Sequence, residues 1–340
     1  MKSRLLGWIL GGILLHCLSS PLLGQISLSG GKGLLRVTSA KPVRSGDLYI
    51  NLFGSAYFEK INNALSKEYH LTLSTNYGLT NFLELDIRFV LYQDDQRHIW
   101  GPIGDTEMGI KLGFPIDTHK ILFFGLRSYL ILPTAPNHNV EFEPFSADHV
   151  GWTNIVCSTI DFTEPIHYPL KLYFNFGYLD HNLQDNLFAA KIDQIFLGTG
   201  IKFPIKSTIL FWEFTTEQFY NRPELSFRQN SMRSSQGIVF IGPFNTIVNL
   251  SCDVNLSKPT PTTFFYPKRL ANWKIWFGVT NYVSLRRYFS KISEKRRHEK
   301  ELQEELKKQE RIRAERKKAI EEMKKMQQIL KKQPENGKEK

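Results

Sequence analysis

The sequence predicts an all-β fold: an antiparallel up-and-down transmembrane β-barrel of about 12 strands, followed by a long charged C-terminal α-helix. Two observations predict the barrel: repeated segments of alternating apolar and polar residues, and a secretory signal ahead of them. In the segment 82–93, apolar residues at the odd positions 83–91 alternate with Glu84, Asp86 and Arg88. Successive strand residues point to opposite faces, so one face would be hydrocarbon and the other charged.

The first 24 residues have the three-part layout of a secretory signal peptide. Lys2 and Arg4 form a short basic region, and residues 5–18 are almost wholly apolar. This apolar run is shorter than the ~20 residues that a membrane-spanning helix needs. We therefore expect residues 1–24 to direct export and to be removed, and residues 25–45 to form an N-terminal periplasmic segment.

Twelve candidate strands make up a predicted barrel over residues 46–284. They lie near 46–58, 67–77, 82–93, 103–114, 120–133, 149–162, 169–180, 187–203, 208–219, 234–243, 246–256 and 272–284. Short turns alternate with longer polar loops, which is typical of bacterial outer-membrane barrels, and an even strand number places both chain ends at the periplasmic rim with the short turns. The alternation is weak in 46–58 and 234–243, and the pattern also allows about 10–14 strands.

Charged side chains gather on the polar face of three consecutive candidate strands. They form a predicted charge ladder in the lumen, which consists of Glu84, Asp86, Arg88, Asp105, Glu107, Lys111 and Arg127. One interpretation is an ion-pair network that stabilises or plugs the wall, because buried charges tend to be paired. The other is a constriction that selects ions or small polar solutes.

Two short motifs resemble those of Gram-negative outer-membrane β-barrels of the porin-like and OmpA-like kind. The unit 77–85, from Tyr77 and Gly78 in the turn to Glu84 in the next strand, resembles their periplasmic hairpin. The last strand partly resembles the terminal signal read by the barrel-assembly machinery, through Trp276, Gly278, Tyr282 and Val283. The resemblance implies a bacterial outer-membrane location, with outer-membrane lipid and the assembly machinery as partners. Nothing in the sequence resembles the peptidoglycan-binding domain of OmpA-type proteins.

The excess of positive charge belongs to the C-terminal tail. The chain has a net charge of +11, and residues 284–340 hold 20 basic and 11 acidic residues. Residues 25–283 hold 22 of each kind, so the predicted barrel is neutral. We therefore expect no binding to nucleic acid, and a basic tail that attracts anionic groups.

Residues 285–333 are predicted to form one long periplasmic helix, because they lack glycine and proline and are rich in good helix formers. Such a helix would be roughly 75 Å long. The sequence leaves two alternatives for this helix, a solitary charged helix or a coiled coil, because two arginines interrupt the apolar seam. The helix is expected to meet an anionic periplasmic partner, and residues 334–340 to be disordered. The oligomeric state is left open.

The residue patterns predict no catalytic group, no cofactor and no metal site. The expected function is therefore a porin-like passive channel for small hydrophilic solutes or ions. The alternative is a structural or tethering envelope protein whose barrel anchors the basic periplasmic helix. An outer-membrane hydrolase is a third interpretation, which rests only on the polar residues of the loop 134–149.

Overall fold

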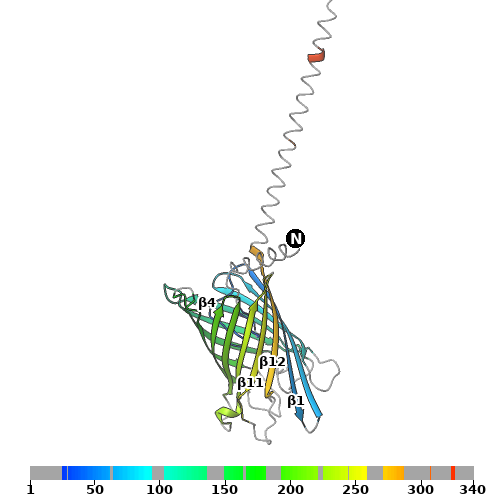
Figure 1. Ribbon diagram of the computed structural model, residues 1–340, viewed down its shortest axis with the longest axis vertical. Coiled ribbons are helices and arrows are strands. Elements are labelled where there is room, and N and C mark those ends of the chain that lie inside the picture. Colours follow the sequence, from blue (N-terminus) through cyan, green and yellow to red (C-terminus); the bar gives the residue numbers. More distant parts are fainter. Residues whose placement is uncertain are drawn as a thin grey trace, which may run out of the picture. The chain divides into compact units, whose positions relative to one another are not determined.

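The chain forms a closed barrel of twelve antiparallel strands in the computed structural model (Figure 1). The structure describes residues 25–28, 30–61, 64–93, 103–135, 149–163, 166–180, 193–220, 225–243, 245–258, 271–286, 307 and 323–325. The strands are β1 (Asp47–Ile61), β2 (Ala64–Gly78), β3 (Leu83–Gln93), β4 (Thr106–Pro115), β5 (Leu122–Leu132), β6 (Gly151–Asp161), β7 (Lys171–Asp180), β8 (Gln194–Ile205), β9 (Thr208–Phe219), β10 (Ser231–Ile241), β11 (Thr246–Asn255) and β12 (Trp273–Ser284). The predicted barrel fold and its strand number are confirmed.

Each strand pairs with the next one along the chain, and β12 closes the barrel by pairing with β1. Asp47 lies opposite Ser284 in this pair, so the chain enters and leaves the barrel at the same rim. A closed barrel of this kind leaves no unpaired sheet edge, because every strand has a neighbour on both sides.

Short turns join the strands at the rim where β1 begins and β12 ends, which we call the short-turn rim. They comprise residues 79–82, 116–121, 162–170, 206–207 and 242–245. Non-glycine residues with positive φ stand in four of these turns, namely Lys120, His167, Lys206 and Asn245. A residue in the left-handed region helps to reverse the chain within a few residues.

The first hairpin is longer than the sequence predicted. A polar connection was expected near 59–66, but β1 and β2 stay paired up to Ile61 opposite Ala64. Strand pairing depends on backbone hydrogen bonds, which polar residues form as readily as apolar ones. Polarity alone therefore ended β1 too early and began β2 too late.

The barrel wall has an outward apolar face and a largely polar inward face. In β5, Leu126 and Leu130 are exposed, whereas Arg127 between them is buried. The outward apolar face continues round the barrel through Leu52, Phe89, Ile110, Phe176, Trp212, Leu250 and Phe277. Exposed hydrocarbon on strand after strand is what a lipid-facing surface requires.

Several predicted segments fall outside the described residues. They are the signal peptide 1–24, the start of the strand predicted at 187–203, most of the helix predicted at 285–333, and the end 334–340. The structure describes only a few residues of this predicted helix, and they are helical: 285–286, 307 and 323–325. The continuous helix therefore stays a prediction. No helix in the described part of the chain is long and apolar enough to cross a membrane.

The substitution Leu126→Arg tests whether the outward face contacts lipid. Leu126 lies in the middle of β5 and is 42% exposed. A basic residue at the lipid-facing middle of a strand should lower the free energy of unfolding in phospholipid vesicles by about 2–4 kcal/mol. Urea unfolding followed by tryptophan fluorescence measures the change. The control His119→Arg, in an exposed turn, should stay within about 0.5 kcal/mol of the parent. Equal stability of the two variants would contradict a lipid-facing wall.

Candidate functional site: a plug inside the barrel lumen

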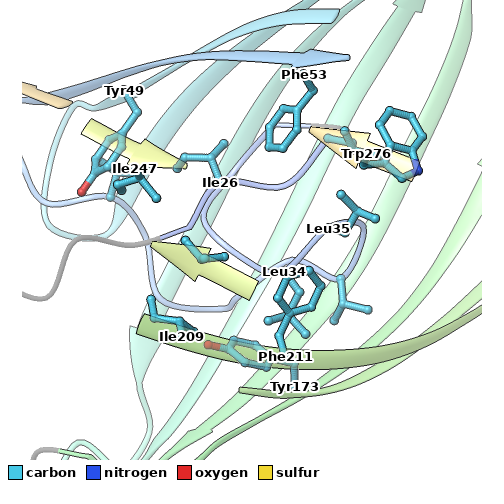
Figure 2. Packing of buried hydrophobic residues seen from close by; sticks show 14 of the residues in the cluster. Ile26, Leu34, Leu35, Tyr49, Phe53, Tyr173, Ile209, Phe211, Ile247 and Trp276 are labelled. Atoms are coloured by element: carbon cyan, nitrogen blue, oxygen red, sulfur yellow. The ribbon is translucent and has the colours of Figure 1, made fainter. Parts of the chain in front are cut away.

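The N-terminal segment lies inside the barrel, and we call residues 25–28 and 30–45 the plug. Ile26, Leu34 and Leu35 are fully buried and pack against inward side chains of the strands (Figure 2). This position corrects the prediction of a periplasmic segment at 25–45. The physical reason is that the apolar side chains of the segment gain free energy by leaving water, and the lumen offers them apolar partners.

The plug folds back on itself and does not join the sheet of the wall. The N–H of Leu28 donates to the carbonyl of Leu35 (2.7 Å), and that of Leu34 donates to the carbonyl of Val37 (2.8 Å). Two isolated bridges pair Ile26 with Lys32 and Gly33 with Thr38. These local bonds satisfy part of the buried plug backbone, and the remainder must be satisfied by the wall.

Inward apolar residues of the wall surround one part of the plug. They are Tyr49, Phe53, Tyr173, Ile209, Phe211, Val239, Ile247, Trp276 and Tyr282. Tyr49 and Phe53 of β1 and Val239 of β10 stand where a water-filled lumen would carry polar side chains. Apolar residues therefore occupy both faces of these strands, which explains the weak alternation of the segments 46–58 and 234–243.

The carboxylate of Glu213 on β9 binds three consecutive amides of the plug. Its oxygens accept hydrogen bonds from the backbone N–H groups of Leu35 (3.1 Å), Arg36 (2.9 Å) and Val37 (3.1 Å). Glu213 and Leu35 are fully buried. Hydrogen bonds to an ionised acceptor are stronger than neutral ones, so Glu213 fixes this turn of the plug against the wall. In the sequence, the position of Glu213 within a strand does not indicate that it contacts residues 35–37.

The side chain of Arg36 joins the plug to two further strands. Its guanidinium lies 2.6 Å from the carboxylate of Asp253 on β11 and 5.5 Å from the ring centre of Trp276 on β12. The indole N–H of Trp276 donates to the same Asp253 oxygen at 2.6 Å. Burial opposes the charge of Arg36, but the neighbouring Asp253 carboxylate raises its pKa. The buried cation is thus matched by a buried anion.

Neutral side chains hold the next part of the plug backbone. The N–H of Thr38 donates to the amide oxygen of Asn175 on β7 (2.7 Å), and the Asn175 amide nitrogen donates to the Thr38 carbonyl (2.8 Å). The N–H of Ala40 donates to the hydroxyl of Thr159 on β6 (2.9 Å). Side chains of the wall thus supply the partners that a neighbouring strand would otherwise give to this backbone.

Glycines in the wall make room for the plug. A Cβ atom at Gly113 on β4 would lie 1.9 Å from the carbonyl oxygen of Ala40. A Cβ atom at Gly200 on β8 would lie 2.2 Å from Cδ1 of Leu34. Both distances are far shorter than van der Waals contact, so a larger residue at either position must displace part of the plug.

The residues of the predicted charge ladder lie on the inner face, where six of them form three ion pairs across β3, β4 and β5. Lys111 pairs with Glu84 (2.8 Å), Arg127 with Asp86 (2.7 Å) and Arg88 with Glu107 (2.5 Å). The first two pairs are fully buried. The seventh residue, Asp105, accepts a hydrogen bond from the N–H of Ala135 (3.0 Å).

The plug covers part of this ladder. The N–H of Val43 donates to Glu84 at 2.8 Å. Gly30 lies so close to Asp86 that a Cβ atom at Gly30 would be 2.6 Å from the carboxylate. The φ of +86° at Gly30 is also a conformation that favours glycine. The ladder therefore contributes to the seat of the plug, which the sequence did not indicate.

The residues of the predicted assembly signal all lie in β12, the strand that closes the barrel. The ring of Tyr282 is 5.0 Å from that of Tyr49 on β1, and a Cβ atom at Gly278 would meet the ring of Phe53 at 2.3 Å. Trp276 points inward and Val283 pairs opposite Leu48. Gly278 and Tyr282 thus pack at the closing seam, and recognition by the assembly machinery stays a prediction.

The hydrolase interpretation rests on residues that lie mostly outside the described part of the chain. Of the loop 134–149, residues 136–148 are not described. Among the described residues, no group of three His, Cys, Asp or Glu side chains could hold a metal ion. This interpretation therefore stays an expectation from the sequence.

The barrel is similar to solved outer-membrane channels. An outer membrane channel from Pseudomonas putida F1 aligns over 72% of this chain and 98% of its own, with 10% identity and a TM-score of 0.50. The NanC porin aligns over 68% of this chain and 98% of its own, with 12% identity and a TM-score of 0.48. The sequence matches no protein-family model and no curated protein. At such low identity the first similarity supports the fold, and function must be inferred from the lumen.

The substitution Glu213→Gln tests the seat of the plug. Because the amide cannot accept three N–H groups as an ionised carboxylate does, local opening of the plug should become easier by about 1.5–3 kcal/mol. Hydrogen exchange at Leu35, Arg36 and Val37 should then accelerate at least about tenfold.

Glu217→Gln is the matched control for this change. Glu217 lies on the same strand, and its carboxylate is 3.9 Å from Arg233. Exchange at residues 35–37 should change much less in this variant, because Glu217 has a smaller electrostatic effect on Arg36 than Asp253 and Glu213 have. Mass spectrometry of the peptide that contains these residues measures both variants, and equal acceleration in the two would refute the specific role of Glu213.

Proposed function

We propose that this protein is an outer-membrane channel that is closed by its own N-terminal plug. Ions or small hydrophilic solutes would pass by diffusion once the plug moves. The observation that carries the proposal is that side chains of the wall hold the plug, while the twelve strands close the barrel among themselves. The plug can therefore leave its seat without breaking a strand pair.

The inner wall supports a hydrophilic path. Besides the ladder, its buried polar residues include Asn51, Asn76, Asn175, Thr215, Ser235, Asn249 and Thr280. A barrel of twelve strands lies in size between the filled barrels of eight strands and the open porins of 16–18 strands, about wide enough for small solutes. Polar groups of the wall that now face the plug would be hydrated in an open state, which lowers the free-energy cost of opening.

The proposed location is the bacterial outer membrane, with the short-turn rim in the periplasm. The outward apolar face, the short turns at the rim where β1 begins and β12 ends, and the predicted secretory signal support this orientation. In this orientation the helix predicted at 285–333 lies in the periplasm. Its excess of basic residues suits an anionic partner there.

Single-channel recording in planar bilayers tests the gate. The mature parent protein should show rare openings, because side chains of the wall hold the plug inside the lumen. In Gly113→Ala the new methyl group would clash with the Ala40 carbonyl, and overpacking of this kind costs about 1–3 kcal/mol. If unseating the plug relieves that cost, the open fraction should rise about 5- to 150-fold.

Gly54→Ala on β1 is the matched control. A Cβ atom there has its nearest neighbour at 3.8 Å, in ordinary contact with Leu71. This variant should open as rarely as the parent. Far-UV circular dichroism and heat-modifiable gel mobility establish that each barrel is folded. Folded Gly113→Ala protein that opens no more often than Gly54→Ala would rule out the plug as the gate.

The second candidate function is a tether, which the basic tail favours because a channel does not need it. Deletion of residues 285–340 separates the two functions, since the wall and the plug precede residue 285. A channel should keep the parent conductance without the tail. A tether should lose its envelope phenotype, measured as detergent sensitivity of cells that carry the truncated gene. An unchanged envelope together with unchanged conductance would dismiss the tether.

A further inference from the structure

A cavity lies between the plug and the wall, close to the short-turn rim. It contains about 440 Å³ of space that atoms do not fill, part of which is open to solvent. Lys32 and Lys41 of the plug line it, together with Lys171 of β7 and Lys202 of β8. Asp161, the last residue of β6, also lines the cavity.

The lining carries more positive than negative charge. The carboxylate of Asp161 lies 2.6 Å from the ammonium of Lys171 and 3.8 Å from that of Lys41. One carboxylate can balance only one of the four lysine side chains when all of them are protonated. Burial, with repulsion from Lys171 and Lys41, lowers the pKa of Lys32 to about 7. An anion in the cavity would offset this repulsion.

Lys202 is the strongest evidence that the cavity binds a ligand. Its side chain lines the cavity, and the residue is only 5% exposed. Within the described part of the chain, its side chain forms no ion pair and no hydrogen bond. Lysines are almost never buried unless they are paired, because an unpaired ammonium loses its hydration without compensation. A buried lysine without a partner on the wall of a cavity is therefore suited to an anionic ligand.

We propose that this cavity binds a small oxyanion that carries more than one negative charge, with phosphate as the representative ligand. Several ammonium groups around one space favour such an anion over a singly charged one. Ser39, Thr159 and Tyr173 also line the cavity. The hydroxyls of Ser39 and Thr159 share a hydrogen bond of 3.3 Å, so one of these two and the Tyr173 hydroxyl are left to donate to the oxygens of the anion. Lysine binds phosphate as a point charge and needs no planar pairing geometry, which suits a site built from four lysines.

The site is shared between the plug and the wall. Lys32 and Ser39 belong to the plug, whereas Lys171 and Lys202 belong to strands. An anion held from both sides stabilises the seated plug, because it binds that state in preference to the displaced one. The site goes beyond the proposed channel function, since its occupancy requires only the closed state of the structure.

Isothermal titration calorimetry with inorganic phosphate, on the folded mature protein in detergent, tests the site. Lys202→Met keeps the aliphatic chain and removes the charge without leaving a carboxylate unpaired. Phosphate affinity should fall at least about tenfold, the usual effect of losing one charge-assisted hydrogen bond. Lys32→Met should show a similar loss, and Lys32 belongs to no strand of the wall, so this variant removes the charge without changing a strand.

Lys274→Met is the matched control. Lys274 is also buried, at 6% exposure, but it lies beside Trp276 on β12 and outside the lining of this cavity. It should keep the parent affinity, and acetate should bind the parent more weakly than phosphate. The site is refuted if the parent does not bind phosphate, if Lys202→Met binds it as tightly as the parent, or if acetate binds equally well. Calorimetry reports binding alone, so these outcomes are independent of the conductance result.

Discussion

Three successive amides of the plug converge on the carboxylate of Glu213, and the side chain of Arg36 in the same turn reaches Asp253. The rest of the lumen is organised around this contact. A lumen filled by chain leaves little water to satisfy buried backbone groups, so the wall must supply their partners. A carboxylate supplies several at once, because its two oxygens accept more than one hydrogen bond each.

The lumen is asymmetric, and the plug matches that asymmetry. Strands β3 to β5 carry the ion pairs of the ladder, whereas β1 and β9 to β12 carry most of the apolar residues around Leu34 and Leu35. The glycines at 113 and 200 allow the plug backbone and Leu34 to approach the wall closely. Different parts of the plug are thus held by hydrogen bonds, by apolar contacts and by close packing against glycines of the wall. Together these contacts select one conformation of the plug.

The way in which the plug is held also makes a closed channel a reasonable proposal. Each hydrogen bond exchanges a bond to water for a bond to protein, so its net contribution is only about 0.5–1.5 kcal/mol, or about twice that with a charged partner. The backbone hydrogen bonds that pair the twelve strands form a separate, continuous network that does not include the plug. Displacement of the plug therefore requires the loss of these hydrogen bonds and of the apolar contacts of residues such as Leu34 and Leu35, and it leaves the strand pairs of the wall intact.

The sequence by itself determined the wall. The period of two along each strand placed Glu84, Asp86 and Arg88 on one face and their apolar neighbours on the other, and the prediction of a membrane barrel assigned the apolar face to the lipid side. It also yielded the strand number and the common rim at which the first strand begins and the last strand ends. Only the tertiary structure decided what fills the lumen. The plug is an irregular segment without periodicity, so nothing local specifies its neighbours, and its contacts with Glu213, Asn175 and Asp253 join residues more than 130 positions apart. Even the weak alternation of the segments 46–58 and 234–243 acquires its meaning only when the plug lies against Tyr49, Phe53 and Val239.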